Sequence, residues 1–317
     1  MLCLGVALAA MLVGEWLPLV GAPVFAILFG LAIASVRPLP PLFEPGVAFA
    51  AKVVLQWSIV LLGAHLSIGE IVSGGVRSLP VMLSTMVVVL ALAYLAGRML
   101  GIDRDLRRLL AVGTAICGGS AIAALASVVD VDRSDVAYAL GTIFAFNVVA
   151  VLTFPAIGHA LALSQSAFGL WAGTAINDTS SVVAAAFAYG SAAGNDAVVV
   201  KLTRTLLIVP LVAFYAWKRI KAHEGERVDW KSVFPWFIVW FLLAAGAATL
   251  GLIPHSWQDP LQRLALFAIV VALAGVGLSS DLRRIRAAGL RPLSLGAILW
   301  IAIALTSLAV ARIAHLG

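Results

Sequence analysis

The sequence Gly173-Thr174-Ala175-Ile176-Asn177-Asp178-Thr179-Ser180-Ser181 lies in the middle of an apolar run from Ala167 to Tyr189. A helix that spans a membrane does not normally carry Asn, Asp, Thr and two Ser side by side at its centre, because polar groups are costly in lipid. Sixty residues earlier another apolar run is interrupted by a similar sequence, Gly113-Thr114-Ala115-Ile116-Cys117-Gly118-Gly119-Ser120. Two polar or glycine-rich interruptions at membrane depth are typical of the binding sites of secondary transporters. The sequence therefore predicts a transporter organised around these two segments.

The composition indicates that lipid is the solvent for most of the chain. The protein has 317 residues, of which 62% are hydrophobic and 11% are charged, and its mean hydropathy is +1.08. Soluble domains are about one quarter charged. We therefore expect an all-α polytopic membrane protein. We find no P-loop, metal-ligand cluster or nucleophile arrangement, so we expect neither an enzyme nor a bound cofactor or metal.

Eleven apolar runs are long enough, or nearly long enough, for the roughly 20 residues that a span needs. They cover residues 1–14, 20–36, 46–66, 80–100, 109–129, 136–158, 167–189, 197–217, 234–253, 261–279 and 292–314. We expect a single transmembrane domain over 1–317, with an extra N-terminal helix at 1–19 and five-helix repeats at 20–158 and 159–317. Because five is odd, the second repeat would run inverted to the first. In this arrangement the fifth and seventh spans run the same way, so their shared Gly-Thr-Ala-Ile does not itself indicate an inverted pair.

Basic residues set the expected orientation, because cytoplasmic loops carry an excess of Lys and Arg. They cluster in three connections that even numbers of spans separate, so all three can share one side with Arg37. The members are Arg98, Arg104, Arg107 and Arg108; Lys218, Arg219, Lys221, Arg227 and Lys231; and Arg283, Arg284, Arg286 and Arg291. The sequence thus predicts a cytoplasmic N-terminus, a periplasmic C-terminus and an outward-facing acidic loop at Asp130–Asp135. The basic charge fits this pattern and not a nucleic-acid partner.

Polar side chains in the two interrupted spans are the main candidates for a substrate site. Asp178 is the acidic residue that the predicted spans place near mid-membrane, where an acidic group usually faces the bundle interior. Helical spacing predicts Thr174, Asn177, Asp178 and Ser181 on or near one face. Polar contacts between helices and close glycine packing are the structural alternatives. The full candidate set is Gly113, Thr114, Cys117, Gly118, Gly119, Ser120, Asn147, Thr174, Asn177, Asp178, Thr179, Ser180, Ser181, Lys201 and Arg204.

Lys201 and Arg204 must enter the membrane region of the eighth span. If that span began after Arg204, too few residues would remain before Trp217 to cross a core of about 30 Å. Their spacing places both on one helix face, where they supply positive charge for an anion or neutralise Asp178. Lys52, near the start of the third span, is expected to be interfacial.

The sequences at 111–122, 173–183 and 201–205 resemble the YeiH family of bacterial inner-membrane proteins, whose members carry the label of sulfate exporters. The resemblance covers nearly the whole chain, and this family is in turn distantly similar to bile-acid symporters and cation/proton antiporters. That kinship implies a panel domain, a core domain and two discontinuous helices that cross near the midplane. It implies that the fifth span is one of them and that the tenth, with Gly275 and Gly277, is its inverted partner. This sequence lacks the paired acidic residues of strong cation antiporters.

These observations favour a secondary transporter of a small anion, such as sulfate, sulfite or an organic sulfonate, in the bacterial inner membrane. Its expected partners are the lipid bilayer, the anion and a coupling H⁺ or Na⁺, with a homodimer left open. A cation-coupled antiporter centred on Asp178 is one alternative. A channel or a membrane scaffold without transport is another, although a channel would show a continuous polar face on several helices.

Overall fold

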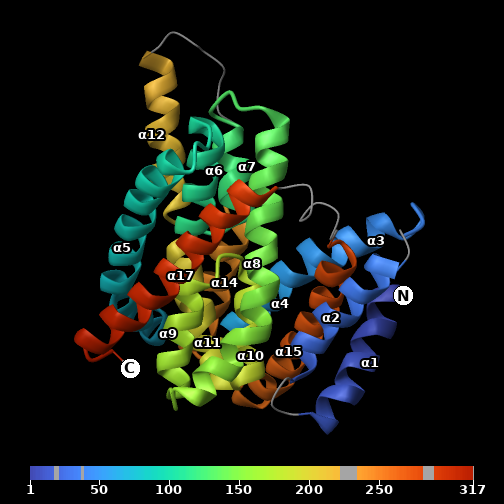
Figure 1. Ribbon diagram of the computed structural model, residues 1–317. Coiled ribbons are helices and arrows are strands. Elements are labelled where there is room, and N and C mark those ends of the chain that lie inside the picture. Colours follow the sequence, from blue (N-terminus) through green and yellow to red (C-terminus); the bar gives the residue numbers. More distant parts are fainter. Residues whose placement is uncertain (18–20, 37–38, 222–233, 281–288, 317) are drawn as a thin grey trace.

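The computed structural model describes residues 1–17, 21–36, 39–221, 234–280 and 289–316, and these residues form helices and no strand (Figure 1). Within them, six helices are long and apolar enough to cross a membrane. The structure therefore confirms an all-α polytopic membrane protein. The elements are α1 (Leu2–Trp16), α2 (Gly21–Val36), α3 (Glu44–Phe49), η1 (Ala50–Val54), α4 (Leu55–Gly63), α5 (Ile68–Met99), α6 (Arg104–Ala115), α7 (Gly119–Ala126), α8 (Arg133–Ala160), α9 (Gln165–Ala175), α10 (Thr179–Tyr189), α11 (Ser191–Thr205), α12 (Ile208–Lys221), α14 (Trp236–Thr249), α15 (His255–Leu278) and α17 (Leu290–Ile313).

The fifth predicted span is a hairpin of two short helices, α6 and α7. Gly118 follows the end of α6 with a φ of +66°, a left-handed conformation that glycine adopts at little cost. After this turn α7 folds back, and a Cβ at Gly113 of α6 would lie 2.9 Å from the Ile122 side chain of α7. Asp135 at the start of α8 is within electrostatic range of Asp103 and Asp105 at the start of α6. The first hairpin therefore returns to the end of the molecule from which it entered, at the top of Figure 1.

The seventh predicted span is a second hairpin, formed by α9 and α10. The rings of Phe168 near the start of α9 and Tyr189 at the end of α10 stack with centroids 3.8 Å apart. Gln165 Oε1 accepts backbone N–H groups from Ala192 and Ala193, at 3.0 and 3.2 Å, just beyond the end of α10. The start of α9 and the end of α10 thus lie side by side, at the bottom of Figure 1. This hairpin enters from the opposite end to the first.

The predicted spans 109–129 and 167–189 therefore turn back instead of crossing, which leaves nine of the eleven described segments as candidate crossings. Hydropathy cannot distinguish these cases, because two half-length apolar arms have the same composition as one span. An arm of 12 residues covers only about 18 Å, well short of a core of about 30 Å. The loop Asp130–Asp135 consequently lies at the same end as Arg104, not at the opposite end as predicted.

Without these two crossings, an even number of crossings still separates the basic connections from one another. All three connections therefore still fall on the same side of the bundle. Within this prediction Arg37, Arg227, Lys231, Arg283, Arg284 and Arg286 lie outside the described residues. The ends of α5 and α12 and the start of α17 lie together toward the top of Figure 1.

The shared Gly-Thr-Ala-Ile sequences do belong to an inverted pair, in contrast to the expectation. Each occupies the end of the first arm of a hairpin, and the two arms enter from opposite ends. A spacing of sixty residues relates the whole unit α6–α7–α8 to α9–α10–α11. The division of the chain into repeats at 158 and 159 stays a prediction.

The tenth span is not the broken partner that the resemblance implied. The helix α15 is continuous from His255 to Leu278. Its glycines instead allow close packing: a Cβ at Gly277 would lie 2.3 Å from the Ile27 carbonyl oxygen of α2, and one at Gly275 would lie 2.9 Å from Ala50 Cβ of η1. The second broken segment is α9–α10.

Buried apolar residues form two main clusters, which divide the fold into two bundles. The hairpin bundle comprises α5–α12 and α17, and its cluster includes Leu109, Ile122 and Phe168. The support bundle comprises α1, α2, α3–η1–α4, α14 and α15, and its cluster includes Ile27 and Ile269. Faces of α10 and α11 also join the second cluster, so the hairpin bundle packs on the support bundle there. The panel and core domains that the resemblance implied stay a prediction.

The hairpins make a testable prediction about topology. In a background with Cys3→Ala and Cys117→Ala, the variants Asp103→Cys and Ser134→Cys should react with a membrane-impermeant maleimide from the same side of the membrane. Ser191→Cys, at the end where the second hairpin enters, should react from the other side. All three positions are exposed. Labelling of positions 103 and 134 from opposite sides would restore the crossing at 109–129 and refute the first hairpin.

Candidate functional site

The tips of the two hairpins meet inside the molecule. A Cβ at Gly118 would lie 3.5 Å from Asp178 Cβ and 3.6 Å from the Asn177 carbonyl carbon. The second tip forms because Asp178 adopts an extended conformation and caps α10: its Oδ2 accepts the Ser180 N–H at 3.1 Å and the Ser180 hydroxyl. Asp is among the best residues at such N-caps. The polar stretch that interrupts the apolar run is thus what ends one half-helix and starts the next.

Lys201 of α11 lies beneath both tips and is fully buried. Its Nζ donates to the Ile116 carbonyl at 3.2 Å, to the Ile176 carbonyl at 2.9 Å and to the Asn177 carbonyl. An ammonium has three N–H donors, so all three are used. The first acceptor belongs to one hairpin and the other two belong to the second.

Arg204, one turn further along α11, makes a matching set of contacts and is 1% exposed. Its Nε donates to the Ala115 carbonyl and its Nη2 to the Thr114 carbonyl, both at 2.8 Å, and Nη1 donates to the Thr174 carbonyl. The last carbonyls of a helix have no partner within it and carry partial negative charge. Lys201 and Arg204 therefore neutralise the C-terminal ends of α6 and α9, and we call these six contacts the carbonyl clamp.

The carbonyl clamp changes the role of several predicted site residues. The sequence placed Lys201 and Arg204 at the substrate, whereas their donors bind backbone and neither residue lines the cavity described below. The prediction of one helix face for Thr174, Asn177, Asp178 and Ser181 is wrong, because the helix stops at Ala175 and restarts at Thr179. Thr174 Oγ1 instead contacts Ser307 Oγ of α17 at 2.6 Å.

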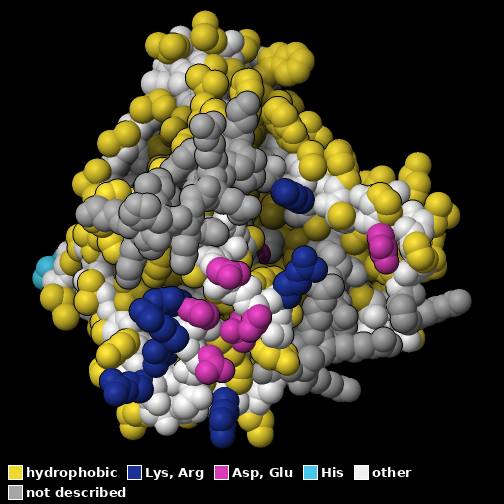
Figure 2. All heavy atoms as spheres, turned by 90° about the horizontal axis from the view of Figure 1, so that it is seen from above, with side chains coloured by type: hydrophobic (Ala, Val, Ile, Leu, Met, Phe, Trp, Pro, Cys, Tyr) yellow, Lys and Arg dark blue, Asp and Glu magenta, His cyan; other side chains and the backbone are white. Residues whose placement is uncertain are grey.

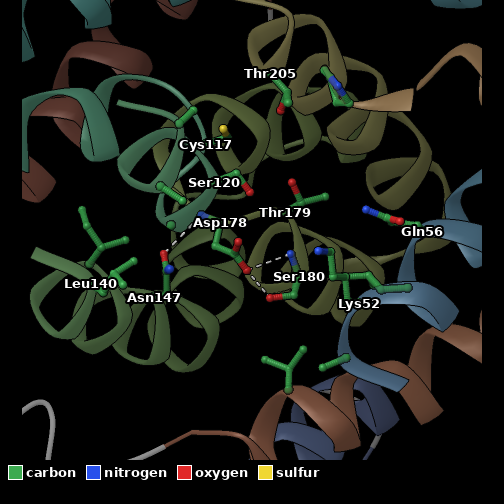
Figure 3. Close-up of a pocket in the computed structure, with 18 of the residues that line it drawn as sticks. Lys52, Gln56, Cys117, Ser120, Leu140, Asn147, Asp178, Thr179, Ser180 and Thr205 are labelled. Carbon is green, nitrogen blue, oxygen red and sulfur yellow. Dashed lines mark hydrogen bonds between the residues drawn. The ribbon is translucent and has the colours of Figure 1, made fainter. Parts of the chain in front are cut away.

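A cavity of about 890 Å³ lies above the tips. It extends from Asp178 past Ser127 at the end of α7 toward Trp236 and Ser279, which lie at the end where the first hairpin enters. Figure 2 looks onto this end, where the surface is hollowed and both basic and acidic side chains gather. Figure 3 shows Ser120, Asn147, Asp178, Thr179 and Ser180 around the inner part of the cavity.

About half of the predicted site residues line this cavity. Those that do are Cys117, Gly119, Ser120, Asn147, Asp178, Thr179 and Ser180. Those that do not are Gly113, Thr114, Gly118, Thr174, Asn177, Ser181, Lys201 and Arg204. Of the second group, the two clamp cations and the carbonyls of Thr114, Thr174 and Asn177 hold the tips in place, and Gly118 forms the turn.

The sequence missed the wall that faces the tips. Lys52 and Gln56, from η1 and α4 of the support bundle, line the cavity together with Thr205, Ser279 and Ser280. Lys52 was predicted to be interfacial. The sequence feature that could have indicated this wall is the spacing of four residues between Lys52 and Gln56, which places both on one face of an otherwise apolar helix.

The clamp leaves the cavity facing the positive ends of two helices. The N-termini of α7 and α10 begin at the tips, and their first residues, Gly119 and Ser120 and then Thr179 and Ser180, line the cavity. The first N–H groups of a helix lack intrahelical partners and attract anions, and at α10 the Asp178 carboxylate already accepts one of them. The opposite, negative ends of α6 and α9 are occupied by Lys201 and Arg204. The arrangement can therefore hold a small anion or a polar molecule.

The clamp predicts a large loss of stability when its arginine is removed. Arg204→Met leaves three buried carbonyls without donors, each of which costs about 1–3 kcal/mol, so the free energy of unfolding should fall by about 3 kcal/mol or more. Arg104→Gln, an exposed change at the start of α6, is the control and should stay within about 0.5 kcal/mol of wild type. Denaturant unfolding of ligand-free protein in detergent measures both. A Met variant as stable as wild type would show that Arg204 does not hold the hairpins.

Comparison with known proteins places this chain in one family. The family model described as "Conserved hypothetical protein 698" matches residues 1–296. A UPF0324 membrane protein of Streptococcus pneumoniae serotype 4 is 42% identical over 315 residues, covering 96% of this chain and 94% of that protein. The UPF0324 membrane protein FN0533 of Fusobacterium nucleatum subsp. nucleatum is 38% identical over 333 residues, covering 98% and 96%. No solved structure matches the chain. This similarity over nearly the whole chain shows that it belongs to the UPF0324 family of membrane proteins, the YeiH family.

Proposed function

We propose that this protein is a secondary transporter that moves a small anion across the bacterial inner membrane by alternating access. The observation that carries the proposal is the meeting of two inverted hairpin tips at a cavity that extends toward one end of the molecule. Broken helices whose N-termini point at the substrate from opposite repeats are a recurring construction in transporters.

The chemistry of the cavity favours an anion. The N-terminus of α7 offers backbone donors, and Ser120 and Thr179 add hydroxyl groups, whereas the Ser180 N–H and hydroxyl already donate to Asp178. A tetrahedral oxyanion such as sulfate, or the sulfonate group of a small organic acid, accepts several hydrogen bonds at once and suits such a set of donors. The positive charge at this site comes from helix ends, whereas Lys201 and Arg204 act beneath it.

The other end of the hairpin bundle is closed by packing. Phe168 and Tyr189 stack there, and a Cβ at Gly173 of α9 would lie 2.8 Å from Val200 of α11. The cavity thus opens to one end, and packed side chains lie between the tips and the other end, as an alternating-access cycle requires. Movement of the hairpin bundle against the support bundle would exchange the two openings.

The basic connections support a cytoplasmic position for the open end, because positive loops remain on that side. With this orientation the N-terminus is cytoplasmic, the C-terminus is periplasmic, and the cavity faces inward.

Asp178 supports a second candidate, a cation-coupled antiporter. Asp178 is the only acidic residue among the described residues that line the cavity. A carboxylate inside a membrane protein can carry a proton or Na⁺. In an anion transporter the same carboxylate would serve as the coupling group, so the two candidates differ in what is carried.

Transport into liposomes distinguishes these candidates. Purified protein in liposomes should take up radiolabelled sulfate, sulfite or methanesulfonate when the same anion is trapped inside, and a pH or Na⁺ gradient should alter the rate. Uptake of Na⁺ or H⁺ without any anion dependence would favour the cation antiporter. Absence of both fluxes, in protein that is folded by thermal unfolding, would contradict a transporter.

Asp178→Asn should impair transport but not folding. Asn is as good an N-cap as Asp, so the start of α10 is kept while the charge is lost, and the response to a pH or Na⁺ gradient should disappear. Asp178→Ala removes the cap as well and should destabilise the protein by about 1 kcal/mol. Measurements of gradient-driven uptake and of denaturant unfolding on both variants test this. A wild-type response to the gradients in Asp178→Asn would make Asp178 a structural cap only.

A further inference from the structure

We infer that Lys52 is the residue that selects anions at this cavity, and that the bound anion bridges the support bundle and the hairpin bundle. This inference rests on the proposed transport function and assigns its binding residues. Lys52 and Gln56 would bind from one wall, and Asn147 with the tip residues Ser120 and Thr179 from the other.

Lys52 is placed by an irregularity in its helix. The segment η1, Ala50–Val54, is a π-helix within the otherwise α-helical stretch Glu44–Gly63. Single π-turns are rare and frequently occur at functional sites. On one side of this turn Ala50 packs against Gly275 of α15, and Lys52 turns to the cavity. Figure 3 shows its side chain directed toward Thr179 and Ser180 at the second tip, with the Gln56 amide beside it.

The Lys52 ammonium has no counterion within the described residues. No ion pair or hydrogen bond joins it to any of them, and its side chain is exposed in the cavity. A charged Lys on a surface meets water and needs no explanation. A charged Lys that lines a cavity between apolar helices, opposite two helix N-termini, is an arrangement that attracts negative charge.

Asn147 of α8 adds a hydrogen-bond donor on the wall opposite Lys52. Its side chain lines the cavity and is only 4% exposed. Its Oδ1 accepts the Asp178 backbone N–H at 3.3 Å, which turns the Nδ2 group the other way. That group has no hydrogen-bond partner among the described residues. Because Asn147 lines the cavity, this group is available to donate to an oxygen of a bound ligand.

The two walls belong to different bundles, which has a consequence for the transport cycle. Lys52 and Gln56 lie on the support bundle, and Ser120, Asn147 and Ser180 lie on the hairpin bundle. A movement that exposes the tips to the opposite end would carry them away from Lys52. The Lys52 ammonium would therefore contribute to anion binding in the conformation described here and not in the conformation that opens to the opposite end.

Calorimetry with sulfate and with methanesulfonate tests the inference on the purified full-length protein at fixed ionic strength. Lys52→Gln should weaken sulfate binding at least about tenfold, because one charge-assisted contact is lost. The monovalent methanesulfonate should lose less. Lys52→Arg keeps the charge and should stay within about threefold of wild type, and Arg104→Gln, an exposed change outside the cavity, should have no effect. Gln56→Glu adds a carboxylate to the same wall and should also weaken sulfate.

A double variant separates this role from simple neutralisation of Asp178. If Lys52 only balances that carboxylate, Asp178→Asn should restore sulfate affinity to Lys52→Gln; we expect no such recovery. Unchanged sulfate affinity in Lys52→Gln, with wild-type protein binding normally, would overturn the assignment of Lys52 and leave anion transport standing. Failure of folded wild-type protein to bind either probe would overturn the proposed function and this inference with it.

Discussion

The structure depends on two buried cations placed where two helices end. A hairpin that turns inside a membrane exposes carbonyls at the end of its first arm, where no water can satisfy them. Lys201 and Arg204 donate to six such carbonyls, three in each hairpin. Because each cation contacts both hairpins, the two tips are fixed to each other as well as to α11. Without these donors the turns at Gly118 and Asp178 would leave unpaired polar groups in the apolar interior.

The carbonyl clamp also determines which charged and polar groups of the hairpins are available to a ligand. With the negative ends of α6 and α9 neutralised, the cavity is left with the positive end of α7 and with the hydroxyl groups of Ser120 and Thr179. Asp178 is held at the tip by Ser180 and contributes the acidic group on this wall. A preference for anions can thus arise although the two most deeply buried cations of the described structure never touch the cavity.

The position of Lys52 gives the two bundles different tasks. The hairpin bundle carries the tips and is fixed internally by the clamp, so it is suited to move as one unit. The support bundle contributes Lys52 and Gln56 from a helix that packs tightly on α15 through Gly275. An anion held between them would couple its own binding to the relative position of the bundles, since its contacts with one wall depend on the distance to the other.

The sequence by itself determined the all-α membrane class, the eleven apolar segments, the two places where helices break, and Asp178 with its polar neighbours as the candidate site. These follow from hydropathy and from residue types that disfavour a helix interior in lipid, which are local properties. Only the tertiary structure decided that 109–129 and 167–189 turn back, because the direction of a chain after a break depends on what receives its ends. It also decided that Arg204 faces carbonyls and that Lys52 faces the cavity. A cation in an apolar helix has the same sequence signal whether its partner is a backbone end or a ligand, and the partner comes from helices far away in the chain.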